Sequence, residues 1–241
     1  MSNTKNVESF GQLIGVLTGY GGTYIPGSKN LRVESLSDLF IRARATMSRV
    51  SVSKTGYETA TNKREVAFAE VKQTTSRILS ELKSSDVLAQ TVADAASMVR
   101  KIKGRVLAEK PEVAEQAEAG KTALKRQRVT GSDYDSVVYH FEKLIQTLLA
   151  EPNYMPSQPA LQVESLQQMM SALRASNAAV VTAVTELGAA RRDRNALLYR
   201  GAGSLYRTAL AAKHQVRAIF GYSSEATKAA NKIQFTKINP R

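Results

Sequence analysis

An internal repeat constrains the fold of this chain more than any other sequence feature. The segment from Phe10 to Leu36, FGQLIGVLTGYGGTYIPGSKNLRVESL, returns with one gap between Phe141 and Leu166 as FEKLIQTLLAEPNYMPSQPALQVESL. A repeat within a chain limits the possible architectures more than any shorter motif does. The sequence therefore predicts two homologous halves, each built on the same plan.

The repeat divides the chain into three parts. We predict a first helical repeat over residues 1–103, a charged linker over 104–131, and a second helical repeat with a basic C-terminal tail over 132–241. The linker has no counterpart in the repeat, and it combines glycine, proline and blocks of like charge. The tail ends in IQFTKINPR, which is either an arm that docks on a neighbour or a frayed end.

The composition predicts a folded helical chain. Of the 241 residues, 43% are hydrophobic and 23% charged, which is typical of globular domains, and only six are proline. There is no cysteine, which excludes disulfides and thiolate chemistry.

The N-terminus MSNTKNVESFGQ lacks the pattern of a signal peptide, so we expect a cytoplasmic protein, with unconventional export left open. We expect no membrane span, because the uncharged window over residues 9–28 is rich in glycine.

Each half is predicted to contain a short helix, a Tyr-x-Pro corner, one long helix and one or two shorter helices. Tyr24 and Tyr154 mark the two corners, where packing is favoured over function. Capping boxes at Ser35 and Ser165 are expected to start the long helices. A heptad seam then runs along each of them; its members are Leu36, Ala43, Val50 and Tyr57 in the first copy and Leu166, Leu173, Val180 and Leu187 in the second.

The long helices are expected to end near Phe68 and Tyr199, which makes each a rod of roughly 50 Å. A turn near Ala69, matched by residues 200–203, should then reverse the chain. Paired serines before an acid, at Ser84-Ser85 and Ser223-Ser224, are predicted to start the last helix of each half. The predicted fold class is thus all-α: an elongated antiparallel helical bundle made of two homologous halves.

The sequence offers no catalytic constellation, and we expect neither enzymatic activity, nor a cofactor, nor a metal site. Residues 22–29 resemble a phosphate-binding loop only superficially, because the Ser-Lys order is reversed and no strand precedes them. The two histidines, His140 and His214, belong to no metal-binding helical pair or nucleophile motif.

Four arginines stand at equivalent places in the two copies: Arg44 with Arg174, and Arg64 with Arg194. Arg64 and Arg194 fall on the heptad seam, where an arginine must reach solvent or pair with a carboxylate. Structural pairing is favoured over anion binding, and the candidate partners are Glu34, Glu164, Glu65 and Asp193.

The charge of the chain is +13, and the C-terminal part carries much of it. A basic surface attracts nucleic acid or an acidic protein surface, although a solvated basic face is the simpler interpretation. Interleaved tyrosines would suit single-stranded nucleic acid. The candidate anion- or partner-binding residues are Arg191, Arg192, Arg200, Arg207, Lys213 and Arg217.

Two motifs in the second half carry a resemblance to known proteins. The run RNALLY from Arg194 to Tyr199, followed by IFGYSS from Ile219 to Ser224, resembles a group of uncharacterised all-helical bacterial proteins with duplicated bundles. The resemblance implies an all-α duplicated bundle in a bacterial protein, and it implies no catalytic residues.

Two functions follow from these patterns. The first is a structural or scaffolding protein that self-associates through its long helices into a homo-oligomer or a filament. The alternative is a basic binding module for nucleic acid or another polyanionic partner, whose affinity would fall as salt rises.

Overall fold

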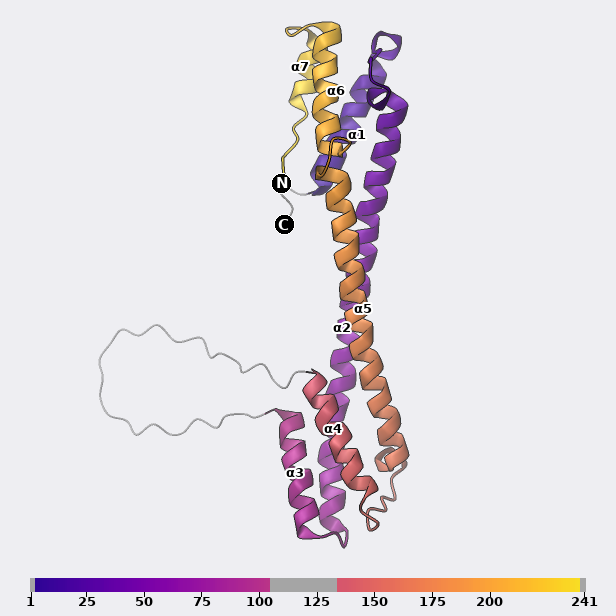
Figure 1. Cartoon of the computed structure of the whole chain (residues 1–241), viewed down its shortest axis with the longest axis vertical. Helices are drawn as coiled ribbons and strands as arrows, with labels where there is room; N and C mark the ends of the chain where they lie inside the picture. The colour runs from indigo at the N-terminus through magenta and orange to yellow at the C-terminus, as the bar shows by residue number, and fades with distance from the viewer. Residues whose placement is uncertain (1–2, 105–133, 239–241) are drawn as a thin grey trace, which may run out of the picture. The chain divides into compact units, whose positions relative to one another are not determined.

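Every regular element of the described chain is helical. The computed structural model describes residues 3–104 and 134–238. Within them lie α1 (Asn3–Gly19), α2 (Val33–Ser84), α3 (Ala89–Lys103), α4 (Tyr134–Leu149), α5 (Val163–Tyr199), α6 (Leu205–Phe220) and α7 (Glu225–Lys232), shown in Figure 1. The prediction of an all-helical chain is confirmed for these residues. All but the first residue of the predicted 104–131 linker lies outside them.

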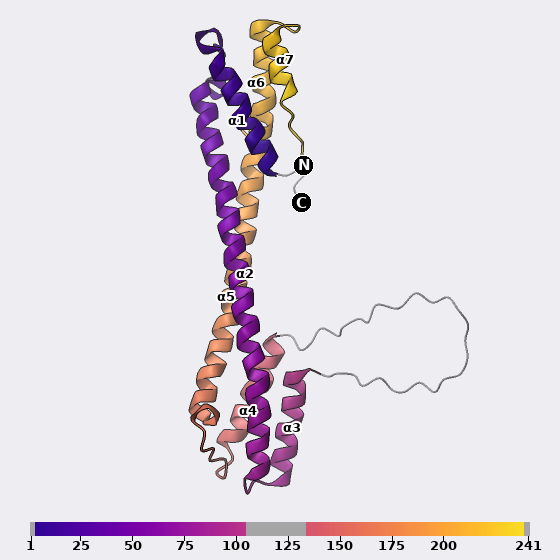
Figure 2. The ribbon, with the colours of Figure 1, turned by 180° about the vertical axis from the view of Figure 1, so that it is seen from behind.

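The chain folds into two compact units. Unit 1 combines Met1–Glu58 with Thr182–Arg241, and unit 2 consists of Thr59–Val181. In unit 1, α6 packs against α7 and α1; in unit 2, α3 packs along α4 (Figures 1 and 2). Because α2 and α5 each contribute residues to both units, a unit does not coincide with one repeat of the sequence.

Each unit has its own hydrophobic core. In unit 1, Phe10, Leu13 and Leu17 of α1 pack with Leu36 of α2 and with apolar residues of α5, α6 and α7. In unit 2, Phe141, Leu144 and Leu148 of α4 pack with Ile78 of α2 and with residues of α3 and α5. These side chains are almost completely removed from water, and such burial stabilises a fold by about 1.5–3 kcal/mol for each large residue.

The predicted heptad seam faces inward along both long helices. Leu36 and Ala43 of α2 are fully buried, as are Leu166 and Leu173 of α5. Further along, Val180 and Leu187 are buried, while Val50 and Tyr57 are half-buried. The seven-residue spacing therefore places the apolar side chains on one face, as a helix of 3.6 residues per turn requires.

The two corners make the same hydrogen bond. The Tyr24 hydroxyl donates to the Leu31 carbonyl at 3.0 Å, and the Tyr154 hydroxyl donates to the Leu161 carbonyl at 2.8 Å. Both acceptors end a short 3₁₀ turn that leads into a long helix. Burial raises the pKa of both tyrosines, and that of Tyr154 reaches about 12 with a smaller contribution from Glu81. Each tyrosine thus ties a loop to the start of its helix.

The predicted turn near Ala69 is wrong. Helix α2 continues to Ser84 and contains 52 residues, so the first long helix does not end near Phe68. Residues 69–84 contain neither glycine nor proline, and Val71, Ile78 and Leu82 continue the buried stripe. In the second copy α5 does end at Tyr199, where Gly201 adopts a φ of 77°. The chain does not reverse there, because α6 continues in the direction of α5 (Figure 1).

Three of the predicted helix starts are also wrong in detail. The long helices begin at Val33 and Val163, two residues before the predicted serine caps, and the Ser35 hydroxyl donates to the Lys29 carbonyl instead. Helix α3 begins at Ala89, and the residue at its capping position, Leu88, makes no side-chain hydrogen bond to the helix. Its expected caps, Ser84 and Ser85, both donate back to the Glu81 carbonyl. Serines at the end of a helix satisfy its free carbonyls as readily as they cap the next helix.

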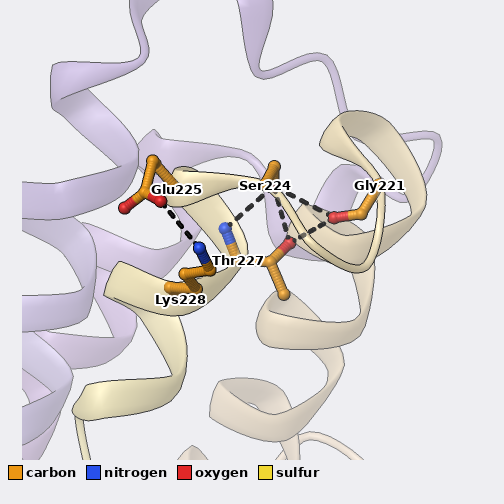
Figure 3. Close-up of polar contacts among 5 residues, drawn as sticks. All are labelled: Gly221, Ser224, Glu225, Thr227 and Lys228. Atoms are coloured by element: carbon orange, nitrogen blue, oxygen red, sulfur yellow. Dashed lines mark hydrogen bonds and ion pairs between the residues drawn. The ribbon is translucent and has the colours of Figure 1, made fainter.

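The predicted start at Ser224 is confirmed. Its hydroxyl oxygen accepts a hydrogen bond from the Thr227 amide at 3.1 Å, as Figure 3 shows. The Thr227 hydroxyl donates to the Gly221 carbonyl at 2.8 Å, and Lys228 forms an ion pair with Glu225 at 2.8 Å. This network joins the end of α6 to the start of α7.

Candidate interaction surfaces

The basic residues predicted in the C-terminal part separate into two groups. Arg191 and Arg192 near the end of α5, Arg200 in the following loop, and Arg207 on α6 are exposed. None of these four side chains forms a salt bridge with a described residue. They belong to unit 1 and leave four guanidinium groups available to a partner.

The other two basic residues make contacts within unit 1, Lys213 with the C-terminal segment and Arg217 with the loop between α6 and α7. The Lys213 ammonium group donates to the Ile233 carbonyl and lies 5.3 Å from the centroid of the Phe235 ring. Burial lowers the pKa of Lys213. The Arg217 guanidinium, one helical turn later, lies 4.9 Å from the centroid of the Tyr222 ring. Both side chains are half-buried, so they are poorly placed to bind a partner.

The C-terminal segment over residues 233–238 docks on its own unit. The Asn6 side chain donates to the Thr236 carbonyl at 2.9 Å and accepts from the Thr236 amide at 3.0 Å. It also donates to the Tyr199 hydroxyl at 3.1 Å, and only 1% of Asn6 is exposed. The described part of the tail is therefore neither frayed nor extended toward another molecule.

The arginines that recur in the two repeats have structural contacts. Arg174 forms a salt bridge of 2.8 Å with Glu142, and Arg44 lies 5.9 Å from the centroid of the Phe40 ring. The partners predicted from the sequence are wrong, because no described bond joins these arginines to Glu34, Glu164, Glu65 or Asp193. The Asp193 carboxylate instead pairs with Arg49 at 2.8 Å.

The two arginines on the heptad seam are partly buried. Arg64 stacks on Tyr134, with its Cζ atom 3.9 Å from the ring centroid, and its Nε atom is buried without a hydrogen bond. Arg194 donates twice to the Asn195 side chain, at 3.1 and 2.8 Å, and burial lowers its pKa. These contacts are of the cation–π and hydrogen-bonding kind rather than ion pairs.

An exposed uncharged stripe runs along the part of α2 that lies in unit 1. Its members recur at alternating spacings of four and three residues, which places them on one helical face. They are Ile41, Ala45, Ser48, Val52 and Thr55, all exposed, with Ile41 63% and Val52 70% exposed. We call this set the α2 stripe. The sequence contains this spacing, but the buried seam on the opposite side of the helix is the stronger periodic pattern.

A cleft is lined by described residues in each of the two units. The cleft in unit 1 has a volume of about 640 Å³ and lies between the first corner and the start of α6. The cleft in unit 2 has about 360 Å³ and lies between α3 and α4. It is lined by His140, whose pKa is lowered by burial and by Lys101 and Lys143.

The described residues give no support for a metal site or for a membrane-spanning helix. No group of three or more His, Asp or Glu side chains is placed to hold a metal ion in residues 3–104 and 134–238. The helices of the same ranges are too short or too polar to cross a lipid bilayer.

Comparison of the chain with family models, with curated proteins and with solved structures finds no significant match.

Proposed function

We propose that the protein is a scaffold that self-associates through its long helices. The observation that carries this proposal is the α2 stripe, in which Ile41 and Val52 face solvent on a helix of 52 residues. Small side chains between them, such as Ala45 and Ser48, allow a second helix to approach closely. Spacings of four and three residues are those by which two helices interlock along a coiled-coil seam. The occupant of the stripe is therefore a helix of another copy of this chain.

We also propose that the two sequence repeats are homologous and that each contributes one half of each unit. The first part of α2 lies in unit 1 and its remainder in unit 2, while α5 does the opposite. Adding 130 to the numbers of the buried residues Phe68, Thr75 and Leu82 of α2 gives Leu198, Leu205 and Ala212, which are also buried. Helix α6 thus corresponds to the last part of α2.

The same relation supports assembly into a polymer. Adding 130 to the first three positions of the α2 stripe gives Ser171, Ala175 and Ala178 of α5, which are also exposed and uncharged. A chain that carries two related but separate contact surfaces can join head to tail, and such contacts continue into rings or filaments.

The test is the mass of the protein in solution as a function of concentration. Multi-angle light scattering should show a mass that rises above the 26.3 kDa of one chain as the concentration increases. The double variant Ile41→Lys with Val52→Lys should stay at the mass of one chain, because a charge in a helix–helix seam cannot be desolvated without a partner.

Leu88→Lys is the matched control, since Leu88 is 73% exposed but belongs to unit 2 and is not a member of the α2 stripe. Its mass should follow that of the unmodified protein. A single-chain mass for the unmodified protein at high concentration would contradict the proposal.

A second candidate function is binding to a polyanion through Arg191, Arg192, Arg200 and Arg207. Their exposure and their lack of acidic partners among the described residues favour it. Affinity for a single-stranded oligonucleotide should then fall steeply with salt, because each phosphate contact releases counterions. Replacing Arg192 and Arg200 with Gln should weaken binding and reduce the salt slope by about 1 for each lost contact. Absence of oligonucleotide binding at low salt would exclude the polyanion-binding function.

A further inference from the structure

Each corner presents one large apolar side chain to solvent at the same position. Ile25, which follows Tyr24, is 76% exposed, and Met155, which follows Tyr154, is 83% exposed. Among the large apolar side chains of the described residues, these two are the most exposed. The buried tyrosine beside each of them fixes its loop through a hydrogen bond of 3.0 or 2.8 Å. The two side chains are therefore held outward by ordered loops.

Burial within a unit does not account for these two residues. A single exposed apolar side chain is ordinary on a protein surface. Here the exposure recurs at both corners although the side chains differ, and neither Ile25 nor Met155 belongs to a core cluster or packs against one. Contact with another molecule would remove them from water.

The first corner is basic. Lys29 and Arg32 are both exposed, and residues 20–33 contain neither Asp nor Glu. The Tyr20 hydroxyl donates to a backbone carbonyl of α7 at 3.0 Å, which ties the start of α7 to this corner. The acid there, Glu225, already forms an ion pair with Lys228. The positive charge of the first corner is therefore not cancelled within the corner.

The second corner has the opposite sign of charge. Residues 150–163 contain Glu151 but neither Lys nor Arg. The positions that correspond to Lys29 and Arg32 hold Pro159 and Gln162. The two corners thus share the exposed apolar residue and differ in charge.

The loop between α2 and α3 adds to this difference. It lies at the same end of unit 2 as the second corner (Figures 1 and 2), and the Asn153 side chain donates to the Asp86 carbonyl at 2.8 Å. Acids outnumber bases at this end of unit 2: the acids are Glu81, Asp86 and Glu151, and the bases are Arg77 and Lys83.

The charges select which corners can meet. Two first corners would bring Lys29 and Arg32 of one copy against the same residues of another, and like charges disfavour that pairing. A first corner and a second corner have complementary charges and one exposed apolar side chain each. Contact between unlike surfaces is heterologous, so each copy keeps one corner of each kind for the next copy.

We propose that the first corner of one copy binds the second corner of another, with Ile25 against Met155 and with Lys29 and Arg32 opposite Asp86 and Glu151. The proposal extends the proposed self-association, but it uses none of the residues of the α2 stripe. An interface between two loops falls in the size class of weak, transient contacts, below about 1,200 Å². It should therefore not raise the mass measured by light scattering, and covalent capture is the suitable test.

The experiment is disulfide capture in the full chain. The chain contains no cysteine, so one introduced thiol reports one position. Ile25→Cys and Met155→Cys are mixed at low salt and oxidised with diamide, and each is also oxidised alone. The yield of disulfide-linked dimer should be several-fold higher in the mixture. Tyr139→Cys is the control, because Tyr139 is 60% exposed in unit 2 but lies outside the corner. Mixing it with Ile25→Cys should give no such gain.

Charge reversal tests the pairing itself. Lys29→Glu with Arg32→Glu, added to Ile25→Cys, should abolish the gain in dimer. Asp86→Lys with Glu151→Lys, added to Met155→Cys, should restore it, which also shows that both proteins are folded. Raising the salt to about 0.5 M should lower the yield for the original pair, because salt screens exposed charges.

Three results would each overturn the proposal: equal yields in the mixture and in the separate variants, an equal yield with Tyr139→Cys, or a yield that charge reversal does not change. Repeating the oxidation with Ile41→Lys and Val52→Lys added to both proteins should leave the yield unchanged. Light scattering reports on the α2 stripe and the disulfide reports on the corners, so failure of one is distinguishable from failure of the other.

Discussion

At the scale of single residues, the structure shows that side chains of the same charge make different contacts. The six basic residues predicted in the C-terminal part share their charge, yet Lys213 contacts the C-terminal segment and Arg217 packs on Tyr222, while the four others face solvent. Their positions on α6 decide this, because residues 213 and 217 lie one turn apart on a single helical face. Sequence spacing shows that they share a face but not which segment covers it.

The corner tyrosines should contribute measurably to stability. Tyr154→Phe removes the hydroxyl that donates to Leu161 and leaves that carbonyl without this partner, so we expect the free energy of unfolding to fall by about 1 kcal/mol. Urea denaturation followed by circular dichroism measures it. Tyr139→Phe is the control, because Tyr139 is 60% exposed. An equal loss in both variants would contradict a role for the corner bond.

The same tyrosine should make the fold sensitive to alkaline pH. Its pKa is raised from an ordinary value of 10.0 to about 12 in the folded protein, so the neutral phenol is favoured by folding. This contribution to stability is fully present below pH 10 and is lost as the pH rises through about 12. The melting temperature should therefore fall over this interval, and the fall should be smaller in Tyr154→Phe. Identical pH profiles for the two proteins would refute the assignment.

At the scale of elements, helix ends depend on local chemistry that sequence motifs describe only in part. Ser224 caps α7 as expected, whereas Ser35 and Ser85 bond to preceding carbonyls. A serine near a helix boundary can serve either neighbour, and the backbone conformation decides which. The extension of α2 beyond Ala69 follows from the absence of glycine and proline there, a signal that the sequence did contain.

Removing the cap of α7 should loosen that helix selectively. Ser224→Ala deletes the acceptor of the Thr227 amide, and loss of an N-cap costs about 1 kcal/mol. Hydrogen exchange of amides in α7 should accelerate, while that of α3 in unit 2 should not change. Ser223→Ala provides the control, since Ser223 is exposed and is not the capping residue. Equal acceleration in the two variants would exclude capping as the cause.

At the scale of the whole molecule, each compact unit combines segments from distant parts of the sequence. Phe10 of α1 belongs to the same core as Ala212 and Val216 of α6. Phe141 of α4 shares a core with Ile78 of α2 and Ile102 of α3. Residues far apart in the chain therefore stabilise one another.

This arrangement predicts which helices lose hydrogen-exchange protection when a core residue is truncated. Phe10→Ala should lower hydrogen-exchange protection in α6 and α7, because truncating a buried phenylalanine costs about 3–5 kcal/mol within its own core. Phe141→Ala should instead lower protection in α3 and α4. Mass-spectrometric hydrogen exchange resolves these peptides. Unchanged protection of α6 and α7 in Phe10→Ala, or of α3 in Phe141→Ala, would contradict the division into units.

By itself, the sequence determined that the described part of the chain is helical and which residues form its buried seam. These features depend on neighbours three, four and seven residues apart, so local periodicity is sufficient to reveal them. Only the tertiary structure decided which helix segments share a core, which arginines face solvent, and that a cleft opens beside α6. Those features depend on contacts between helices that are far apart in the sequence, and no spacing rule along the chain encodes such contacts.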